Sequence, residues 1–339
     1  MAEAWGTRVW LGEVRDWVAE SLSGVCVDEL GEVVSYSIQP WSTVWTVECG
    51  GSRYWLKANR RTRRQEGVVQ AAVAGLAPEY VDVPVAVEPE RGWILTRDGG
   101  QVLWTTLANL RRVEIDSLAS LVADYARLQR RTVGCRWLLA SAGVREASAL
   151  VPDVAARAQA SHLVSLPADD PRRITEEQYG RVLSALPALR QVGKILAAGP
   201  VPPALDQGDL WPGNIFCPVG TCGYRFFDFA DAVWGHPFGS LVMLVVECVF
   251  RWEVPQPEDA VDLRDDRIRE VFDSYLRQWT DLASIEELRE LAGYALRTAS
   301  LNCAAAWLRN LGDATADDLA RYGRMPWAWL EDVTKPVLI

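Results

Sequence analysis

The chain has 339 residues, of which 49% are hydrophobic and 24% are charged, and its formal net charge is −10. These values lie close to globular averages and exclude bulk disorder, and the length suffices for two domains or one bilobed unit. Because binding to nucleic acid needs a broad positive surface, the negative charge argues against a nucleic-acid partner.

Membrane insertion and secretion find no support in the sequence. The longest apolar run, Ser240–Phe250, is too short to span a bilayer and contains Glu247. The N-terminus lacks the basic and apolar regions of a secretory signal. We therefore expect a cytoplasmic protein with no membrane partner. The seven cysteines, an odd number scattered through the chain, argue against a disulfide framework.

The N-terminal part of the chain has the pattern of a small β-rich unit. Apolar residues at helical spacing predict a helix over 8–22, and a second helix is expected over 62–76. A Gly-Gly-Ser turn at residues 50–52 is typical of a hairpin. Five runs have the composition of strands: 32–38, 43–49, 53–58, 81–88 and 92–98.

From about Leu103 onward the pattern is mostly helical, with one loop-and-strand interruption over 205–232. Strands and helices do not alternate, which excludes a doubly wound parallel sheet. The order predicts an α+β protein with a β-rich lobe over 1–98 and a helical lobe over 99–339. The clearest helical patterns cover 118–131, 175–196, 237–252, 267–282 and 285–311.

Lys57 and Glu66 form the first candidate pair. Lys57 is one of only three lysines among 35 basic residues, and it lies near the end of an apolar strand. A lysine that points inward from a strand is costly unless it meets an anion, either a phosphate or a carboxylate. Glu66, on the following helix, could supply that carboxylate. Taken singly, a solvent-facing Lys and a surface Glu are the simpler interpretations.

The sequence LDQGDLWPGNIF, residues 205–216, contains Asp209 and Asn214 at a separation of five. Pro212 and Gly213 lie between them and prevent a regular helix. This is the spacing of the D-x-x-x-x-N catalytic loop, in which the Asp accepts the proton of the substrate hydroxyl and the Asn holds Mg²⁺.

The sequence YRFFDFADA, residues 224–232, predicts a short apolar strand that ends on Asp228. A carboxylate at this point, close behind the Asn loop, completes a set of hard oxygen ligands suited to Mg²⁺ bound to phosphates. Asp231 lies three residues further on. It could add a second metal contact, orient the loop, or be a plain surface carboxylate.

With these motifs in this order, the chain resembles the aminoglycoside phosphotransferase and choline kinase-like family of the protein-kinase-like fold. Residues 205–216 resemble the family's HGDLHPGN loop, and FFDFADA, residues 226–232, resembles its metal-binding DFG segment. WLKA and QEG resemble its strand Lys and helix Glu. ERGWILTRDGGQVL and WGHPFGSL resemble segments of actinobacterial members. The resemblance covers about residues 33–252.

The resemblance implies a bilobed protein-kinase-like fold and transfer of the γ-phosphate of ATP, or of GTP, to a hydroxyl of a small molecule. The acceptor would be an antibiotic such as an aminoglycoside, or a metabolite alcohol. Asp209 would be the catalytic base, and Asn214 and Asp228 would ligate Mg²⁺. Lys57, held in place by Glu66, would contact the α- and β-phosphates.

The resemblance also implies a nucleotide-binding role for two further segments. The hinge near Thr96 and Asp98 would present backbone groups to adenine. The turn at residues 39–43 stands where protein kinases have a glycine-rich loop. Because this turn has no glycine, Ser42 and the neighbouring backbone amides would have to cover the phosphates.

Departures from the family pattern motivate other hypotheses. Gln207 stands where the family usually has His, and with the glycine-free turn it suggests a catalytically weak, nucleotide-binding pseudokinase. Retention of Lys57, Asp209, Asn214 and Asp228 together argues against that reading. A protein kinase ranks lowest, because no APE-type activation segment follows residues 228–232. His236 is interpreted as a structural, hydrogen-bonded residue.

The identity of the acceptor stays open. The acidic balance suits a polycationic aminoglycoside, and the acidic segment 258–266 is either a pocket for it or a solvated helix start. Alternatively, tryptophans of the helical lobe could stack on an aromatic or quaternary ammonium acceptor. These are Trp252, Trp279, Trp307, Trp327 and Trp329.

Overall fold

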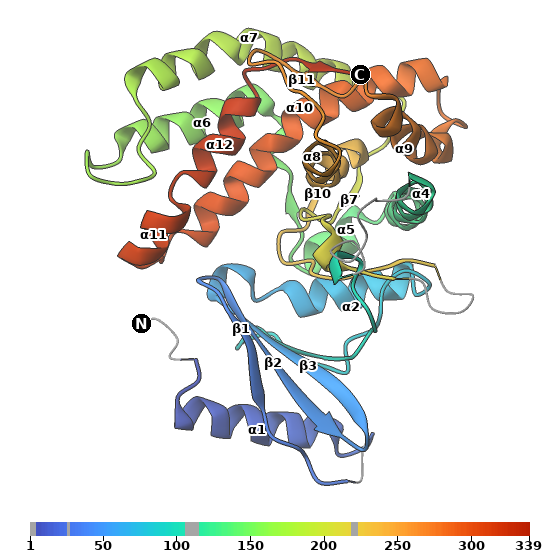
Figure 1. Cartoon of the computed structure of the whole chain (residues 1–339), viewed down its shortest axis with the longest axis vertical. Coiled ribbons are helices and arrows are strands. Elements are labelled where there is room, and N and C mark those ends of the chain that lie inside the picture. The colour runs from blue at the N-terminus through green and yellow to red at the C-terminus, as the bar shows by residue number, and fades with distance from the viewer. Residues whose placement is uncertain (1–4, 26–27, 106–114, 218–222) are drawn as a thin grey trace.

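The computed structural model describes residues 5–25, 28–105, 115–217 and 223–339, and these form two lobes (Figure 1). The part of the predicted helical pattern that runs through 106–114 lies outside the described residues. No helix within the described ranges is long and apolar enough to cross a membrane.

The N-terminal lobe is built on a five-stranded antiparallel sheet with the order β1-β2-β3-β5-β4. Each of the five predicted runs overlaps one of these strands. The run over 81–88 contributes only three residues, because Pro84 lacks the N–H that a continued ladder would need. The strands are β1 (Val34–Ile38), β2 (Ser42–Cys49), β3 (Ser52–Asn59), β4 (Ala86–Glu88) and β5 (Trp93–Arg97).

Helix α1 (Arg8–Leu22) covers one face of this sheet (Figure 1). Its first turn is capped by Thr7, whose hydroxyl accepts a hydrogen bond from the amide of Trp10. Because side chains alternate along a strand, Leu56 of β3 is buried under α1 while Lys57 points to the opposite face. The alternation therefore directs Lys57 toward the second lobe.

Cys49, at the end of β2, is disulfide-bonded. The sequence-based argument against a disulfide framework therefore does not extend to this cysteine. Cys135, Cys248 and Cys303 are free thiols.

Helix α2 (Glu66–Leu76) lies between the sheet and the second lobe (Figure 1). The predicted helix over 62–76 begins later than expected, because a 3₁₀ turn, η1 (Arg61–Arg63), occupies its first residues. Glu66 is thus the first residue of α2. Val69 and Val73 pack into the core of the second lobe, so α2 is held from both sides.

The second lobe is mostly helical and is organised around α10, which contacts α6, α7, α9 and α12. Capping boxes at Thr175 and Ser284 begin α7 and α10. The predicted helix over 237–252 starts as a 3₁₀ turn, η4 (Pro237–Leu241). The helices are α4 (Ile115–Thr132), α5 (Arg136–Ser141), α6 (Pro152–Ser165), α7 (Glu176–Ala198), α8 (Val242–Arg251), α9 (Asp266–Leu276), α10 (Ile285–Asn310), α11 (Ala316–Tyr322) and α12 (Met325–Asp332).

Short strands at the junction of the lobes position the loops of interest. β10 pairs with both β6 and β7, and β8 pairs with β9 as a second small ladder. The strand that was predicted to end on Asp228 is reduced to β9, so Asp228 lies just beyond a strand end. These strands are β6 (Arg145–Glu146), β7 (Ala204–Asp206), β8 (Ile215–Phe216), β9 (Arg225–Phe226) and β10 (Val233–Gly235), and a further pair is β11 (Val261–Asp262) with β12 (Val337–Leu338).

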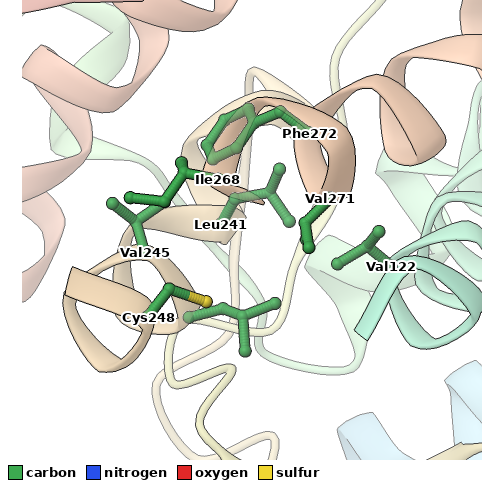
Figure 2. Close-up of a pocket in the computed structure, with 8 residues that line it drawn as sticks. Val122, Leu241, Val245, Cys248, Ile268, Val271 and Phe272 are labelled. Carbon is green, nitrogen blue, oxygen red and sulfur yellow. The ribbon is translucent and has the colours of Figure 1, made fainter. Parts of the chain in front are cut away.

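A small void of about 10 Å³ lies between α4, α8 and α9 (Figure 2). Only apolar side chains and the Cys248 thiol surround it, and all of them are buried. An apolar space of this size holds no ligand and is a packing feature of the core. Its lining comprises Val122, Leu241, Leu244, Val245, Cys248, Ile268, Val271 and Phe272.

Candidate active site

A cavity of about 910 Å³ receives side chains from both lobes. It is large enough for a nucleotide together with a small acceptor. Its lining includes all eight residues to which the sequence analysis gave a catalytic, nucleotide-binding or metal-binding role: Ser42, Lys57, Glu66, Thr96, Asp98, Asp209, Asn214 and Asp228.

Lys57 joins the two lobes at the centre of this cavity. Its ammonium donates to Glu66 Oε1 at 3.0 Å and to Asp228 Oδ2 at 2.7 Å. Asn59, which sequence reasoning missed, donates to Glu66 Oε2 at 2.8 Å. The sequence could have indicated Asn59, because it lies two residues after Lys57 on the same strand and therefore on the same face. Lys57 is therefore a partly buried lysine held between two carboxylates.

The charges of this cluster stabilise one another. Burial alone would lower the pKa of Lys57, but the Asp228 and Glu66 carboxylates outweigh it and raise that pKa above its ordinary value. Burial would likewise raise the pKa of Asp228, but Lys57 and Arg63 bring it below the ordinary value. Both groups are thus charged at neutral pH.

The β8–β9 ladder explains why the loop of Asn214 lies beside the loop of Asp228. Ile215 pairs with Phe226, so the residue before β8 and the residues after β9 lie at the same end of the ladder. The amide of Phe227 donates to the carbonyl of Asn214 at 3.1 Å. This contact ties the two loops together.

Asp209 and Asn214 are linked within the loop over 205–216. The side-chain amide of Asn214 donates to the Asp209 carbonyl and to Asp209 Oδ2, each at 3.0 Å. Burial, and next the nearby Asp228 carboxylate, raises the pKa of Asp209 to about 6. A carboxylate with this pKa is well matched to accept a proton near neutral pH.

Asn214 and Asp228 fit a hard divalent cation. The amide nitrogen of Asn214 is used by Asp209, which leaves its oxygen for a ligand. Asp228 gives Oδ2 to Lys57 and retains Oδ1. Amide and carboxylate oxygens are the donors that Mg²⁺ prefers, with phosphate and water completing the shell.

The sequence matches no protein-family model, and no curated protein matches it. Solved structures do resemble it. Plasmodium vivax ethanolamine kinase has a TM-score of 0.66 at 12% identity, over 97% of this chain and 90% of that one. The GDP and kanamycin complex of APH(2″)-IIIa gives 0.59 at 14%, over 94% and 98%. Macrolide 2′-phosphotransferase type I gives 0.58 at 12%, over 96% and 97%.

The chain has the fold of small-molecule kinases. These neighbours confirm the bilobed α+β, protein-kinase-like fold predicted from the sequence. At such low identities the likeness establishes the fold, and the chemistry has to be argued from the residues of the cavity.

Two backbone positions in this kinase fold are constrained by sterics. Gly208 has φ 85°, and a Cβ there would overlap the carbonyl of Asp231. Only glycine fits this close approach of the Asp209 loop to the segment that contains Asp228 and Asp231. Asp228 has φ 60° and is one of two non-glycine residues with positive φ in the described chain. Such strain is typical of functional loops.

Gln207 holds the backbone of the segment that contains Asp228. It is fully buried, and its side-chain amide donates to the carbonyls of Phe227 and Asp228, to the latter at 3.1 Å. Its backbone amide donates to the hydroxyl of Tyr125 at 3.0 Å. Gln207 therefore fixes the backbone at Asp228.

We predict that Gln207→Leu destabilises the protein by about 1–3 kcal/mol, because two partly buried carbonyls lose their donor. Gln207→His keeps a donor and should lose clearly less. Urea denaturation of both variants measures the difference. Equal losses for Leu and His would show that the hydrogen bonds do not carry the role of Gln207.

Asp231 is neither a surface carboxylate nor free for a metal. Its exposed fraction is only 8%, one oxygen is ion-paired with Arg63, and the other accepts from Arg309 at 3.3 Å. Because both oxygens are engaged by guanidinium groups, loop orientation is the sequence-based alternative that the contacts favour.

The structure also shows where Asp206, the Asp98 amide and the five tryptophans lie relative to the cavity. Asp206 is buried on β7 outside the cavity lining and accepts the amide of Gly208 at 2.8 Å. The amide of Asp98 donates to the carbonyl of Arg53 at 2.9 Å, so this hinge N–H is already used within the lobe. Trp279 and Trp329 are buried core residues, and none of the five tryptophans suggested for the acceptor lines the cavity.

His236 is structural, as expected. Its Nδ1 accepts the amide of Phe238 at 3.4 Å, and its Nε2 is buried without a hydrogen-bond partner. Burial lowers the pKa of His236 to about 3, from an ordinary value of 6.5. The imidazole is therefore neutral in the folded protein over the whole physiological range.

This depressed pKa makes the contribution of His236 to stability depend on pH. As pH falls below 6.5, the unfolded chain binds a proton at His236 that the folded chain refuses, so this contribution falls by about 2 kcal/mol between pH 7 and 5. His236→Asn keeps the capping acceptor and should show a correspondingly smaller loss in urea titrations at the two pH values. The control His162→Asn, at an exposed position, should behave as wild type, and equal acid losses in both variants would contradict the assignment.

Proposed function

We propose that the protein is an ATP- or GTP-dependent O-phosphotransferase that transfers the γ-phosphate to a hydroxyl of a small molecule. The observation that carries this proposal is the cavity in which Asp209, with a raised pKa, lies close to the Lys57–Asp228 pair. The solved neighbours support it, because they include an ethanolamine kinase, a macrolide 2′-phosphotransferase and APH(2″)-IIIa in complex with GDP and kanamycin.

In this proposal the N-terminal lobe, 1–98, binds the nucleotide. Lys57, held by Glu66, would donate to the α- and β-phosphates and neutralise part of their charge. The base would lie at the end of the cavity lined by Thr96 and Asp98, and Ser42 would lie over the phosphates. Thr96 and Asp98 then offer their side chains and remaining backbone groups, since the Asp98 amide is engaged.

The second lobe, 99–339, would carry the chemistry. Asn214 and Asp228 would hold Mg²⁺, which supplies charge neutralisation at the phosphate oxygens. Asp209 would accept the proton of the attacking hydroxyl. The hydroxyl oxygen forms a bond to the γ-phosphorus as the bond from that phosphorus to the nucleoside diphosphate oxygen breaks. The reaction needs little covalent work from the protein beyond alignment and charge stabilisation.

The acceptor would lie next to Asp209, where the cavity lining offers it the aromatic and apolar side chains of Trp211 and Met243. The acidic segment 258–266 is a solvated helix start, as one sequence alternative held: Asp265 caps α9, and the carboxylates of Asp262 and Asp265 pair with arginines two residues further on. It therefore does not favour a polycationic acceptor.

A nucleotide-binding measurement followed by a transfer assay tests the proposal. Isothermal titration with ATP and GTP, with and without Mg²⁺, should show Mg²⁺-dependent binding. Transfer of a labelled γ-phosphate is then measured with kanamycin, a macrolide and ethanolamine as acceptor probes. Absence of nucleotide binding under all conditions would refute the proposal.

Because such an enzyme draws on nucleoside triphosphates, we propose that it acts in the cytoplasm.

A further inference from the structure

The segment that joins β3 to α2, residues 60–65, contacts the second lobe at several points. Arg145 donates to the carbonyl of Thr62 at 2.9 Å, and Gln65 donates to the carbonyl of Ala230 at 3.2 Å. Arg63 is ion-paired with Asp231. The next residue along the chain is Glu66, so these contacts fix the point at which α2 begins.

Arg63 is the buried centre of this junction. Its exposed fraction is 7%, and its Nε has no hydrogen-bond partner. The carboxylates of Asp228, Glu66 and Asp209 all act on its charge. A cation in that position offsets a cluster of buried carboxylates, each of which would otherwise be costly to hold without water.

The same guanidinium supports the turn over the phosphate end of the cavity. It lies 5.8 Å from the ring centroid of Trp41, the residue before Ser42. Trp41 in turn meets Trp307 of α10 and Tyr322 of α11, with ring centroids at 5.5 Å in both cases. The turn that replaces a glycine-rich loop is thus packed against the second lobe.

We propose that Arg63, through its ion pair with Asp231, is a positioning residue that holds Glu66 of α2 and the loop of Asp228 in the arrangement that binds Mg²⁺–nucleotide. This inference rests on the proposed function. The physical argument is one of register. Arg63 lies three residues before Glu66, and Asp231 lies three residues after Asp228, so one contact sets both partners of Lys57 relative to each other.

The test compares Arg63→Met with Arg309→Met. Methionine keeps much of the side-chain volume and removes the charge. Arg309 contacts the same carboxylate as Arg63 but from α10 of the second lobe, so it cannot set the position of α2. The affinity of ATP with and without Mg²⁺ is measured by titration calorimetry, kcat and the acceptor KM by γ-phosphate transfer, and the melting temperature by calorimetry.

Arg63→Met should weaken Mg²⁺–ATP binding about tenfold and leave metal-free ATP binding nearly unchanged, since loss of register acts on the metal loop. kcat should fall about 100-fold, as for a displacement of about 1 Å at a reacting centre, with little change in the acceptor KM. Arg309→Met should change each quantity less than about threefold, because its pair with Asp231 lies within one lobe. Arg63→Lys, which keeps the charge without the planar fork, should be intermediate.

The outcomes separate the inference from the function beneath it. If Arg63→Met lowers only the melting temperature and keeps the Mg²⁺ dependence of ATP binding, Arg63 is merely structural and the inference fails. If Arg63→Met does not fold, wild-type behaviour of Arg63→Lys in Mg²⁺–ATP affinity and kcat overturns the proposal, and an intermediate result supports it. A wild-type protein that binds no Mg²⁺–ATP overturns the proposed function itself and the inference with it.

Discussion

Asp209→Asn is expected to lower kcat about 10²–10⁴-fold, the usual contribution of a positioned general base. The Asn side chain has the size of the Asp and can still meet the amide of Asn214, which contacts both the carbonyl and Oδ2 of residue 209. It cannot accept the hydroxyl proton. Mg²⁺–ATP affinity should therefore change less than about threefold, since the nucleotide is bound elsewhere.

Asp206→Asn is the matched control for this variant. Asp206 is also buried and also has a pKa raised by burial to about 6, but it lies outside the cavity lining. Asparagine there can still accept the amide of Gly208. Rapid-quench measurement of labelled phosphate transfer gives kcat for both variants. Full transfer by Asp209→Asn, or an equal loss in both variants, would contradict the role assigned to Asp209.

The sequence sufficed to predict those parts of the site that depend on local geometry. Strand alternation places Lys57 opposite the buried Leu56, and this required only the period of a β-strand. The pairing of Asn214 with Asp209 follows from their spacing in one short loop. Motifs of this kind are compact, so their geometry is nearly complete before the lobes pack.

Contacts between distant segments could not be predicted in the same way. Asp231 appeared equally suited to a metal, to loop orientation or to solvent, because its partners Arg63 and Arg309 are 168 and 78 residues away. Local pattern carries no information about which of 32 arginines, the 35 basic residues less three lysines, will reach a given carboxylate. That the loop of Asn214 lies beside the loop of Asp228 was expected from the order of motifs, and the β8–β9 ladder supplies the cause.

The positions of the tryptophans could not be predicted from the sequence either. A large amphipathic ring suits a core, a surface or a ligand site equally well. Trp279 is fully buried, whereas Trp307 reaches across to Trp41 of the other lobe. Which of these happens depends on how the helices pack, and the helical period alone does not decide it.

Asp228→Asn is expected to weaken Mg²⁺–ATP binding about 10- to 100-fold, corresponding to loss of a charged contact worth about 1.5–3 kcal/mol. Asparagine tolerates the left-handed backbone at φ 60°, so the loop should keep its shape. The variant removes one negative charge from the proposed metal site and from the 2.7 Å contact with Lys57. Lys57 keeps Glu66 as its partner and stays charged.

The signature of this variant is the loss of metal dependence. ATP affinity measured by titration calorimetry should become nearly the same with and without Mg²⁺, because Lys57 still meets the phosphates while the cation has lost its charged ligand. Asp82→Asn is the control, since Asp82 lines the same cavity but pairs with Arg225. If Asp228→Asn and Asp82→Asn retain equal Mg²⁺ dependence, Asp228 does not hold the metal, and the cation must be bound by the phosphates with other ligands.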